Sequence, residues 1–415
     1  MPIRRTLAQR TLAMTIAAAA SLASHAQPGE PAPGYKTPPD AIRRVLDTPP
    51  TPSVSISPDD RWILLLERRN LPSIADLAAP MLRLGGSRLN PNTNGPHGPR
   101  PYTGFVLRPM PAPGQPVGSS DHRIETPKDA ALSGPSWSAD GRYFTFTNTI
   151  NPAGESDPTG RPLPSGTELW LCDTQTRSVK RLVGPTLNTA NAVGIRWMPD
   201  QKSVLVSLIP DGRAPIPQKP AIPGGPVTQD AGGSVAPVRT YQDLLTDTHD
   251  EALFDWIMTG QLAIVNVDTG AIRRVGTPAI HAGVSPSPSG EYLLVGTVKR
   301  PYSYAVPWSL FPQSWEIIET SSAKPVRTVV EMPLRENIPT QGVQTGPRGL
   351  NWLDTQPATL LWTEALDGGD PRAKVDHRDR CMLLAAPFTA EPKEWLKLQH
   401  RSEEHTSELQ SRQYL

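Results

Sequence analysis

Short apolar runs alternate with polar turns along most of this chain, and one local pattern recurs. At five places an aromatic or apolar residue is followed by a turn rich in Asp, Gly and Ser, and then by a short apolar run. The five copies begin at Ile56, Trp137, Trp197, Pro286 and Trp352, and their apolar runs cover residues 62–66, 143–147, 203–208, 292–295 and 358–362. A turn that leads into a strand, repeated along a long chain, is typical of radially repeated sheets. The pattern therefore predicts an all-β fold, a β-propeller.

Each repeat continues with further strands that alternate apolar and polar positions. Polar turns such as Asp268–Gly270 close antiparallel hairpins between them. Second strands are predicted over residues 169–172, 262–267, 315–318 and 381–384, and third strands over 272–275 and 326–330. The hairpins predict an incomplete propeller over residues 51–400, with about five blades of four-stranded antiparallel sheet.

The repeats are longer than a minimal blade, so each should carry an insertion. A blade needs about 40 to 50 residues. The aligned turn positions Asp59, Asp140, Asp200, Ser289 and Thr355 are instead 81, 60, 89 and 66 residues apart. The longest insertion covers 210–258. Its first part, 210–238, is rich in Pro and Gly and is expected to be a mobile loop. Apolar residues then recur at helical spacing over 241–258, which predicts a short helix across one face of the propeller.

Composition narrows the function classes. The 49 prolines among 415 residues favour strands and rigid turns over long helices. The 41 basic and 40 acidic residues are balanced and scattered, which argues against nucleic-acid binding. The two cysteines, Cys172 and Cys381, exclude a disulfide scaffold and a cysteine-based zinc site. No cofactor is predicted.

The first 50 residues differ from the repeats. Arg4, Arg5 and Arg10 precede a short apolar run that ends in small residues at Ala26. This pattern predicts a secretory signal peptide over residues 1–26, with a retained amphipathic anchor as the alternative. Residues 27–50 are rich in Pro, Gly and Ala and are interpreted as a linker. We therefore expect a periplasmic or secreted protein that has no membrane segment after cleavage.

The last fifteen residues, 401–415, show no apolar alternation. Their sequence, RSEEHTSELQS followed by RQYL, looks like the translation of a common DNA-sequencing adaptor. We interpret this tail as adaptor-derived and the chain as a truncated fragment. A native polar tail is the alternative.

Several long motifs resemble the glutamyl endopeptidase branch of the prolyl oligopeptidase family. They are LRLGGSRLNPNTNG at 82–95, RTYQDLL at 239–245 with HDEALF at 249–254, RPYSYAVP at 300–307, ALDGGDP at 365–371 and DHRDR at 376–380. The likeness covers roughly residues 50–398. It implies an N-terminal propeller joined to a C-terminal α/β-hydrolase domain that carries a serine nucleophile, an Asp and a His.

No catalytic residue is expected in this chain. A nucleophile elbow needs Gly-x-Ser-x-Gly at a strand-to-helix turn, and that string does not occur. The segment around Ser285 lacks the second glycine, and Pro286 removes the N–H that an oxyanion hole takes from the residue after the nucleophile. Ser285 is therefore interpreted as a turn residue.

Three other groups of residues are more simply structural. Asp367, Asp370, Asp376, His377 and Asp379 do not match the spacing of an EF-hand, so a charged turn between two strands is favoured over a metal site. The acidic residues near the expected helix start are interpreted as capping residues, and the repeated tryptophans as core wedges rather than a ligand cage. These groups are Asp247, His249, Asp250 and Glu251, and Trp137, Trp197 and Trp352.

One residue is a candidate for substrate binding. If the intact enzyme cuts after glutamate, a cation must meet the substrate carboxylate, and arginine suits that role through its bidentate fork. Arg300, beside Tyr302 and Tyr304, is the candidate. The alternative is that Arg300 pairs with an acidic turn of the protein itself.

Together these observations predict the substrate-gating propeller of a secreted serine endopeptidase that hydrolyses peptide bonds after Glu. Its partners would be peptide substrates and the missing hydrolase domain, and the chain alone is predicted to be inactive. A non-catalytic periplasmic binding propeller is the alternative, which would need a closing final blade. An enzyme acting within the central channel would need convergent carboxylates or histidines, and the apolar strands offer few.

Overall fold

The computed structural model describes residues 37–72, 74–98, 101–111, 114, 120–222, 240–338 and 341–402. The chain forms two compact units, Met1–Thr48 and Pro49–Leu415. In the first unit, the described part contains the helix α2 (Asp40–Leu46), which has no buried residue. The predicted linker over 27–50 therefore includes a helix that was not predicted, since seven residues are too few to show a helical period. The predicted signal peptide lies outside the described residues.

The second unit contains five antiparallel blades of four strands each, which confirms the predicted fold. Blade 1 is β1 (Ser53–Ile56), β2 (Trp62–Arg68), β6 (Tyr102–Pro109) and β7 (His122–Arg123). Blade 2 is β8 (Ser136–Trp137), β9 (Tyr143–Ile150), β10 (Gly166–Asp173) and β11 (Val179–Val183). Blade 5 is β19 (Arg348–Trp352), β20 (Thr359–Ala365), β21 (Asp379–Ala385) and β22 (Lys393–Leu398).

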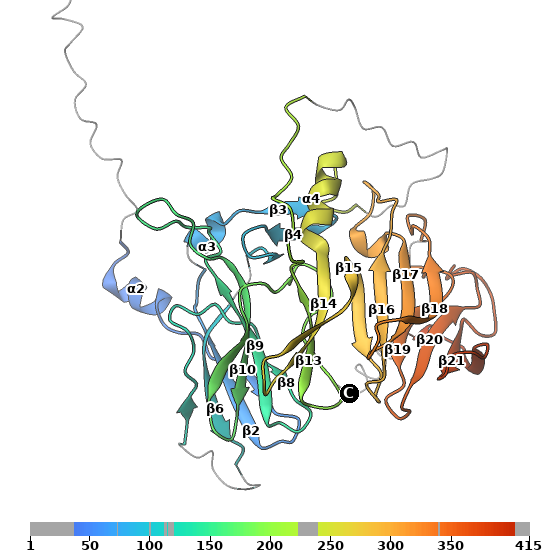
Figure 1. Cartoon of the computed structure of the whole chain (residues 1–415), viewed down its shortest axis with the longest axis horizontal. Coiled ribbons are helices and arrows are strands. Elements are labelled where there is room, and N and C mark those ends of the chain that lie inside the picture. The colour runs from blue at the N-terminus through green and yellow to red at the C-terminus, as the bar shows by residue number, and fades with distance from the viewer. Residues whose placement is uncertain are drawn as a thin grey trace, which may run out of the picture. The chain divides into compact units, whose positions relative to one another are not determined.

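Blades 3 and 4 share one long strand, β15 (Ile272–Pro286). Its first part pairs with β14 (Thr259–Asn266) and its last part with β16 (Tyr292–Val298), so the two blades form one seven-stranded sheet. The remaining strands of this sheet are β12 (Arg196–Trp197), β13 (Ser203–Leu208), β17 (Gln313–Glu319) and β18 (Pro325–Met332). Figure 1 shows β14 to β18 in yellow and orange, with β16, β17 and β18 beside the strands of blade 5.

The predicted first strands are present, but each is the second strand of its blade. The aromatic position that opens the repeat lies on an earlier strand, as Trp137 does on β8 and Trp197 on β12. These earlier strands are as short as two residues, too short to show an alternating pattern. The recurring turn is therefore the hairpin between the first and second strands.

The repeated tryptophans join each blade to the one before it. The indole N–H of Trp137 donates to Ser55 Oγ of β1 at 2.9 Å, and that of Trp197 donates to the Ser136 carbonyl of β8 at 2.9 Å. In blade 5 the Trp352 indole donates to the Ser285 carbonyl of β15 at 3.1 Å. The prediction that these residues are core wedges is confirmed for Trp352, which is buried, while Trp137 and Trp197 are part-buried against the cores between blades.

All connections between the second and third strands lie at one end of the blades, because successive strands run antiparallel. We call this end the insertion end. It carries α3 (Ile74–Ala78), the short strands β3 (Leu82–Leu84), β4 (Ser87–Asn90) and β5 (Gly95–Pro96), the helix α4 (Thr248–Met258) and the 3-10 turn η1 (Trp308–Leu310). In Figure 1, α3, β3, β4 and α4 stand together above the blade strands.

The insertions of blades 1, 3 and 4 bond to one another. Gly86 N donates to the Asp243 carbonyl at 2.8 Å, and Trp308 N donates to the Gly85 carbonyl at 2.8 Å. A Cβ on Gly86 would lie 2.6 Å from Pro307 Cβ, so this close approach requires glycine. Beneath these contacts is a core that includes Leu84, Phe254 and Phe311. The insertions thus form a layer of their own, the insertion layer.

Candidate functional site

The helix α4 lies in the insertion layer and contributes four buried residues to its core. Asp247 accepts a hydrogen bond from Asp250 N at 2.9 Å, and the Asp250 carboxylate accepts one from Thr246 N at 2.9 Å. The predicted capping role is confirmed for these two aspartates. The helix begins at Thr248 rather than at Tyr241 because Asp247 has the extended backbone of an N-cap residue. Of the predicted loop over 210–238, residues 210–222 form no helix or strand, and 223–239 lie outside the described residues.

One side of α4 buries apolar residues and holds the helix against the layer. Leu253, Phe254, Ile257 and Met258 are all buried. The Phe254 ring packs edge-on against the rings of Tyr302 and Phe311, with centroids 5.2 and 5.8 Å apart. Such pairs add specific geometry to the apolar burial, so α4 has a fixed orientation.

Arg300 is bound by two carboxylates of α4. Its guanidinium contacts Glu251, and Nη2 donates to Asp255 Oδ2 at 2.6 Å. The guanidinium also lies 4.3 Å above the Tyr302 ring. Tyr304 Oη donates to Glu251 at 2.7 Å, and burial together with this hydrogen bond raises the pKa of Tyr304 to about 12. The geometry favours the structural alternative for Arg300, since its fork is already occupied.

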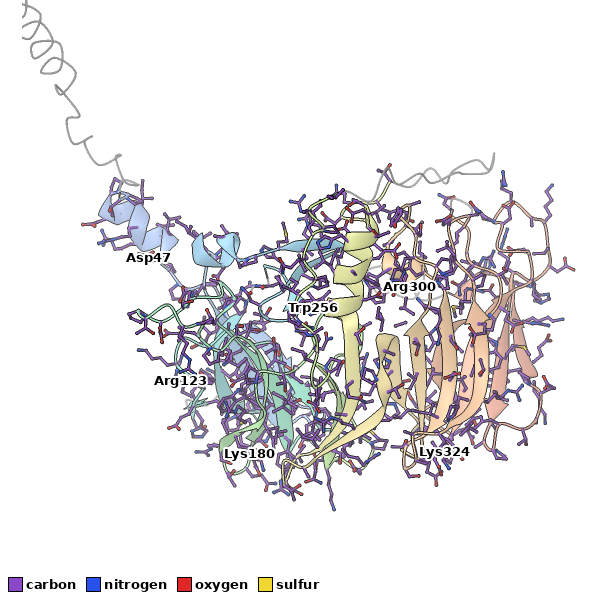
Figure 2. The ribbon with its side chains drawn as sticks, turned by 45° about the horizontal axis from the view of Figure 1, so that its top comes forward. Asp47, Arg123, Lys180, Trp256, Arg300 and Lys324 are labelled. Atoms are coloured by element: carbon purple, nitrogen blue, oxygen red, sulfur yellow. The ribbon has the colours of Figure 1, made fainter. Side chains whose placement is uncertain are left out.

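A second arginine lies on another side of the same helix. The Arg213 guanidinium stacks 3.9 Å from the centre of the Trp256 ring, and Nη1 donates to the Trp256 carbonyl at 3.3 Å and to Asn94 Oδ1. The Trp256 indole donates to the Ala214 carbonyl at 2.8 Å. Figure 2 labels Trp256 and Arg300 on different sides of α4. Burial lowers the pKa of Arg213 to about 10. Sequence reasoning missed this residue because it lies in a Pro- and Gly-rich segment.

The acidic residues of blade 5 form buried ion pairs. Asp367 and Asp379 have fully buried side chains, and Arg348, Arg378 and Arg401 surround them. Burial alone would raise their pKa values, but hydrogen bonds from these arginines hold the pKa of both carboxyls below the usual value. In the described part of the chain no group of His, Cys, Asp or Glu could hold a metal ion. The charged-turn interpretation fits Asp367 and Asp370, whereas Asp379 belongs to β21.

Arg401, the first residue of the predicted tail, contacts two aspartates of blade 5. Its Nη1 donates to Asp379 at 2.8 Å and its Nη2 donates to Asp367 at 2.5 and 2.6 Å. Only 5% of Arg401 is exposed. The first residue of the predicted adaptor tail is therefore part of blade 5 in this structure. Residues 403–415 lie outside the described part.

Ser285 is not a turn residue, contrary to its interpretation from the sequence. It lies in β15 and pairs with Leu294 of β16. Pro286, which ends the same strand, occupies the position that tryptophan holds in three other blades. Its ring has no donor for an inter-blade hydrogen bond.

A cavity of about 340 Å³ lies at the insertion end of blade 2. Its lining residues in the described part of the chain are all uncharged, and they include Thr93, Tyr102, Thr147, Asn188 and Ser207. Asn94, the partner of Arg213, sits between two lining residues of this cavity, Thr93 and Gly95. The lining of a mainly apolar, uncharged cavity and the partner of a cation thus lie in the same turn. Among the described residues, no helix is long and apolar enough to cross a bilayer.

Comparison with known proteins finds two relatives of this chain by sequence. No protein-family model matches the chain. Two curated plant proteins, each named "Probable glutamyl endopeptidase, chloroplastic", are 35% identical to it over 369 residues, one from Oryza sativa subsp. japonica and one from Arabidopsis thaliana. The matches cover 88% of this chain but only 38% and 37% of the two relatives. The chain therefore spans little more than a third of their length.

Solved structures resemble it only weakly. Pyrococcus horikoshii acylaminoacyl peptidase is 12% identical with a TM-score of 0.37, over 85% of this chain and 40% of that one. The β-propeller domain of the Trilobed protease from Pyrococcus furiosus is 10% identical with a TM-score of 0.37, over 83% and 72%. The fold assignment rests instead on the strand pairing. The identity of 35% to the named plant proteins confirms the resemblance of the motifs. Over these 369 residues, the chain is thus similar to proteins named glutamyl endopeptidases, the branch of the prolyl oligopeptidase family that its motifs resemble.

Proposed function

We propose that this chain is the substrate-gating propeller of a serine endopeptidase that cuts peptides after glutamate. The observation that carries the proposal is the 35% identity, over 369 residues, to proteins named glutamyl endopeptidases. That match covers under two fifths of each relative, which leaves room for a hydrolase domain in the intact protein. In that protein the propeller would limit access to short or unfolded peptides, and the hydrolase domain would perform acyl transfer.

The insertion end is the face that we assign to the hydrolase domain. In antiparallel blades, β1 begins and β22 ends at this end, so the segments before and after the blades leave from the same face. The described parts of the family-like motifs also lie there, in the insertion layer and in the connection between β20 and β21. A domain that continues from β22 would therefore meet the insertion layer first.

The same proposal includes export. Residues 1–26 would direct the protein to the periplasm or out of the cell. The plant relatives are named chloroplastic, which describes those proteins alone. N-terminal sequencing of the processed protein tests this part: a start at Gln27 in the periplasmic or secreted fraction supports it, and an unprocessed cytosolic protein contradicts it.

The test of the enzymatic proposal is to read the gene beyond the codon for Ser402 and express the intact protein. We expect a Gly-x-Ser-x-Gly motif downstream, and cleavage of a short peptide after Glu but far more slowly after Gln at the same position. The chain of 415 residues, expressed alone, should not cleave either peptide. A gene that continues without a hydrolase domain would contradict the proposal and favour a non-catalytic binding propeller.

A further inference from the structure

Two arginines of the insertion end are part-buried without a carboxylate partner among the described residues. They are Arg213 and Arg335, and burial lowers the pKa of each. Other arginines that are buried or part-buried, such as Arg348 and Arg378, pair with aspartates. A cation that is taken partly out of water loses hydration, and that loss is normally offset by a paired anion. An arginine kept in such a place without one is therefore a candidate anion site.

Of these two arginines, Arg213 has N–H donors that are neither fully buried nor bonded to a described residue. In Arg335 both terminal nitrogens are engaged, one with Gln344 and Met332 and the other with the Ser309 carbonyl, and Nε is buried. In Arg213, Nη1 alone is engaged with described residues. Its Nε and Nη2 have no hydrogen bond to a described residue and are not among the fully buried unpartnered atoms. These two N–H groups form the side of the guanidinium fork that fits a carboxylate.

The guanidinium of Arg213 is also held in place before any ligand arrives. Trp256 supports one face of it, and a cation over an indole ring is attracted by the ring. Asn94, which accepts from Nη1, is 1% exposed and is anchored by its own donation to the Ile257 carbonyl at 2.9 Å. A second asparagine, Asn188, donates to the same carbonyl at 3.1 Å. A fixed donor loses little entropy on binding, which favours affinity for a small anion.

The nearby acids of α4 are directed elsewhere. Asp255 directly precedes Trp256, yet its carboxylate bonds to Arg300 and to the Tyr302 hydroxyl. Glu251 bonds to Arg300 and Tyr304. Both carboxylates of the helix are thus paired with Arg300, and neither contacts Arg213. The two arginines thus differ in role. Arg300 balances the charge of the helix, whereas Arg213 keeps N–H donors that could bind an anion.

We propose that Arg213, rather than Arg300, binds the side-chain carboxylate of the glutamate after which the intact enzyme cuts. This inference rests on the proposed function and names the residue that sets its specificity. The carboxylate would accept from Nε and Nη2 of Arg213. The uncharged cavity beyond Asn94 would take neighbouring, uncharged parts of the peptide. A glutamine side chain at the same position would bind Arg213 less strongly, because a neutral amide oxygen makes weaker hydrogen bonds to a guanidinium than a carboxylate does.

A purely structural role for Arg213 makes a different prediction. Since Nη1 donates to a carbonyl in the last turn of α4, Arg213 could serve only as a cap for that helix end. A cap would affect folding and would change the cleavage of Glu and Gln peptides equally. A carboxylate-binding residue changes their ratio.

The experiment compares the intact protein with its Arg213→Met, Arg213→Gln and Arg300→Met variants. The measured quantity is kcat/KM for two peptides that differ only in Glu or Gln before the cut bond. We expect Arg213→Met to lower the Glu-to-Gln ratio by roughly tenfold to a hundredfold, because a charged hydrogen-bonded pair is lost. The change should come from a lower kcat/KM for the Glu peptide. Arg213→Gln keeps a donor to Asn94 and should lower the ratio similarly. Arg300→Met should keep the ratio while lowering the melting temperature.

The outcomes separate the two proposals. A ratio that is unchanged in both Arg213 variants, or an equal loss on both peptides, overturns the role of Arg213 and leaves the proposed function standing. The proposal for Arg213 is also overturned if Arg300→Met lowers the Glu-to-Gln ratio while the Arg213 variants keep it. If the unchanged intact protein does not cleave after Glu, the proposed function fails and this inference fails with it. If Arg213→Met does not fold, the Arg213→Gln variant decides.

Discussion

At the scale of single residues, the partners of a side chain decide its role more than the motif in which it lies. Arg300 stands in a conspicuous motif beside two tyrosines, yet Glu251 and Asp255 occupy it. Arg213 stands in the Pro- and Gly-rich insertion, yet its Nε and Nη2 have no partner among the described residues. Sequence reasoning proposed an arginine for a glutamate-binding site. It could not show which arginines already have partners, because the fold brings Arg213 and Arg300 to α4 from distant parts of the chain.

His281 provides a prediction about pH. It is 3% exposed in β15, and burial lowers its pKa from 6.5 to about 4, against a smaller opposing effect of the Gly260 backbone. Between these values the unfolded chain binds a proton that the folded chain does not. The stability should therefore fall as pH drops from about 6.5 toward 4, by about 3 kcal/mol at the lower limit.

The measurement is the melting temperature of the protein and of His281→Gln at several pH values across this range. The variant should lose less stability on acidification than the unchanged protein. His400→Gln, at an exposed position, is the matched control and should keep the original pH dependence. Identical pH dependence in the protein and in His281→Gln would contradict the account of this residue.

At the scale of elements, neighbouring blades are held together either by an indole hydrogen bond or by a shared strand. We call such a contact between two blades a joint. Indole hydrogen bonds join blades 1 and 2, 2 and 3, and 4 and 5. Between blades 3 and 4 the equivalent position is Pro286, and there the continuous strand β15 forms the joint instead. At the free edge of blade 1 the equivalent residue is Ile56, which is 50% exposed, whereas Trp352 is 8% exposed. The repeated aromatic position is thus a joint residue, and its exposure reports whether a preceding blade is present.

Replacing one of these tryptophans tests the joint. Trp197→Phe keeps an aromatic ring but removes the indole donor to the Ser136 carbonyl. We expect a loss of about 1 kcal/mol in the free energy of unfolding, the usual value of one hydrogen bond. Urea unfolding measures it, with Trp395→Phe as control because that tryptophan is 54% exposed on the outer strand β22. Equal stability of the two variants would show that the indole bond does not hold the blades together.

How much the sequence could predict follows from the range of the interactions. The hairpins were predictable because Asp and Gly turns and apolar alternation act over a few residues. The two-residue strands β8 and β12 were not, since their pairing depends on the neighbouring strand. The small sheet of β3, β4 and β5 was also missed, although the motif at 82–95 marked the segment as special. The ion pairs of Asp367 and Asp379 with Arg401 join residues more than twenty positions apart, beyond any local pattern.

At the scale of the whole molecule, the described residues of the second unit form five blades and an insertion layer. In the described part, Arg213 bonds to Asn94, a sequence neighbour of two residues that line an uncharged cavity at the insertion end. Under the proposed function, this propeller would decide which substrates reach a catalytic domain. The intact protein is therefore the form in which that role is tested.

The most direct test of this account is the cleavage of one glutamate-containing sequence in two forms by the intact protein. One form is a short free peptide, and the other is the same sequence within a stably folded protein. We predict rapid cleavage of the peptide after Glu and cleavage of the folded protein slower by on the order of a hundredfold or more, as substrate exclusion requires. Equal cleavage of the two forms, or no cleavage of the peptide, would contradict the central claim that this propeller gates a peptidase.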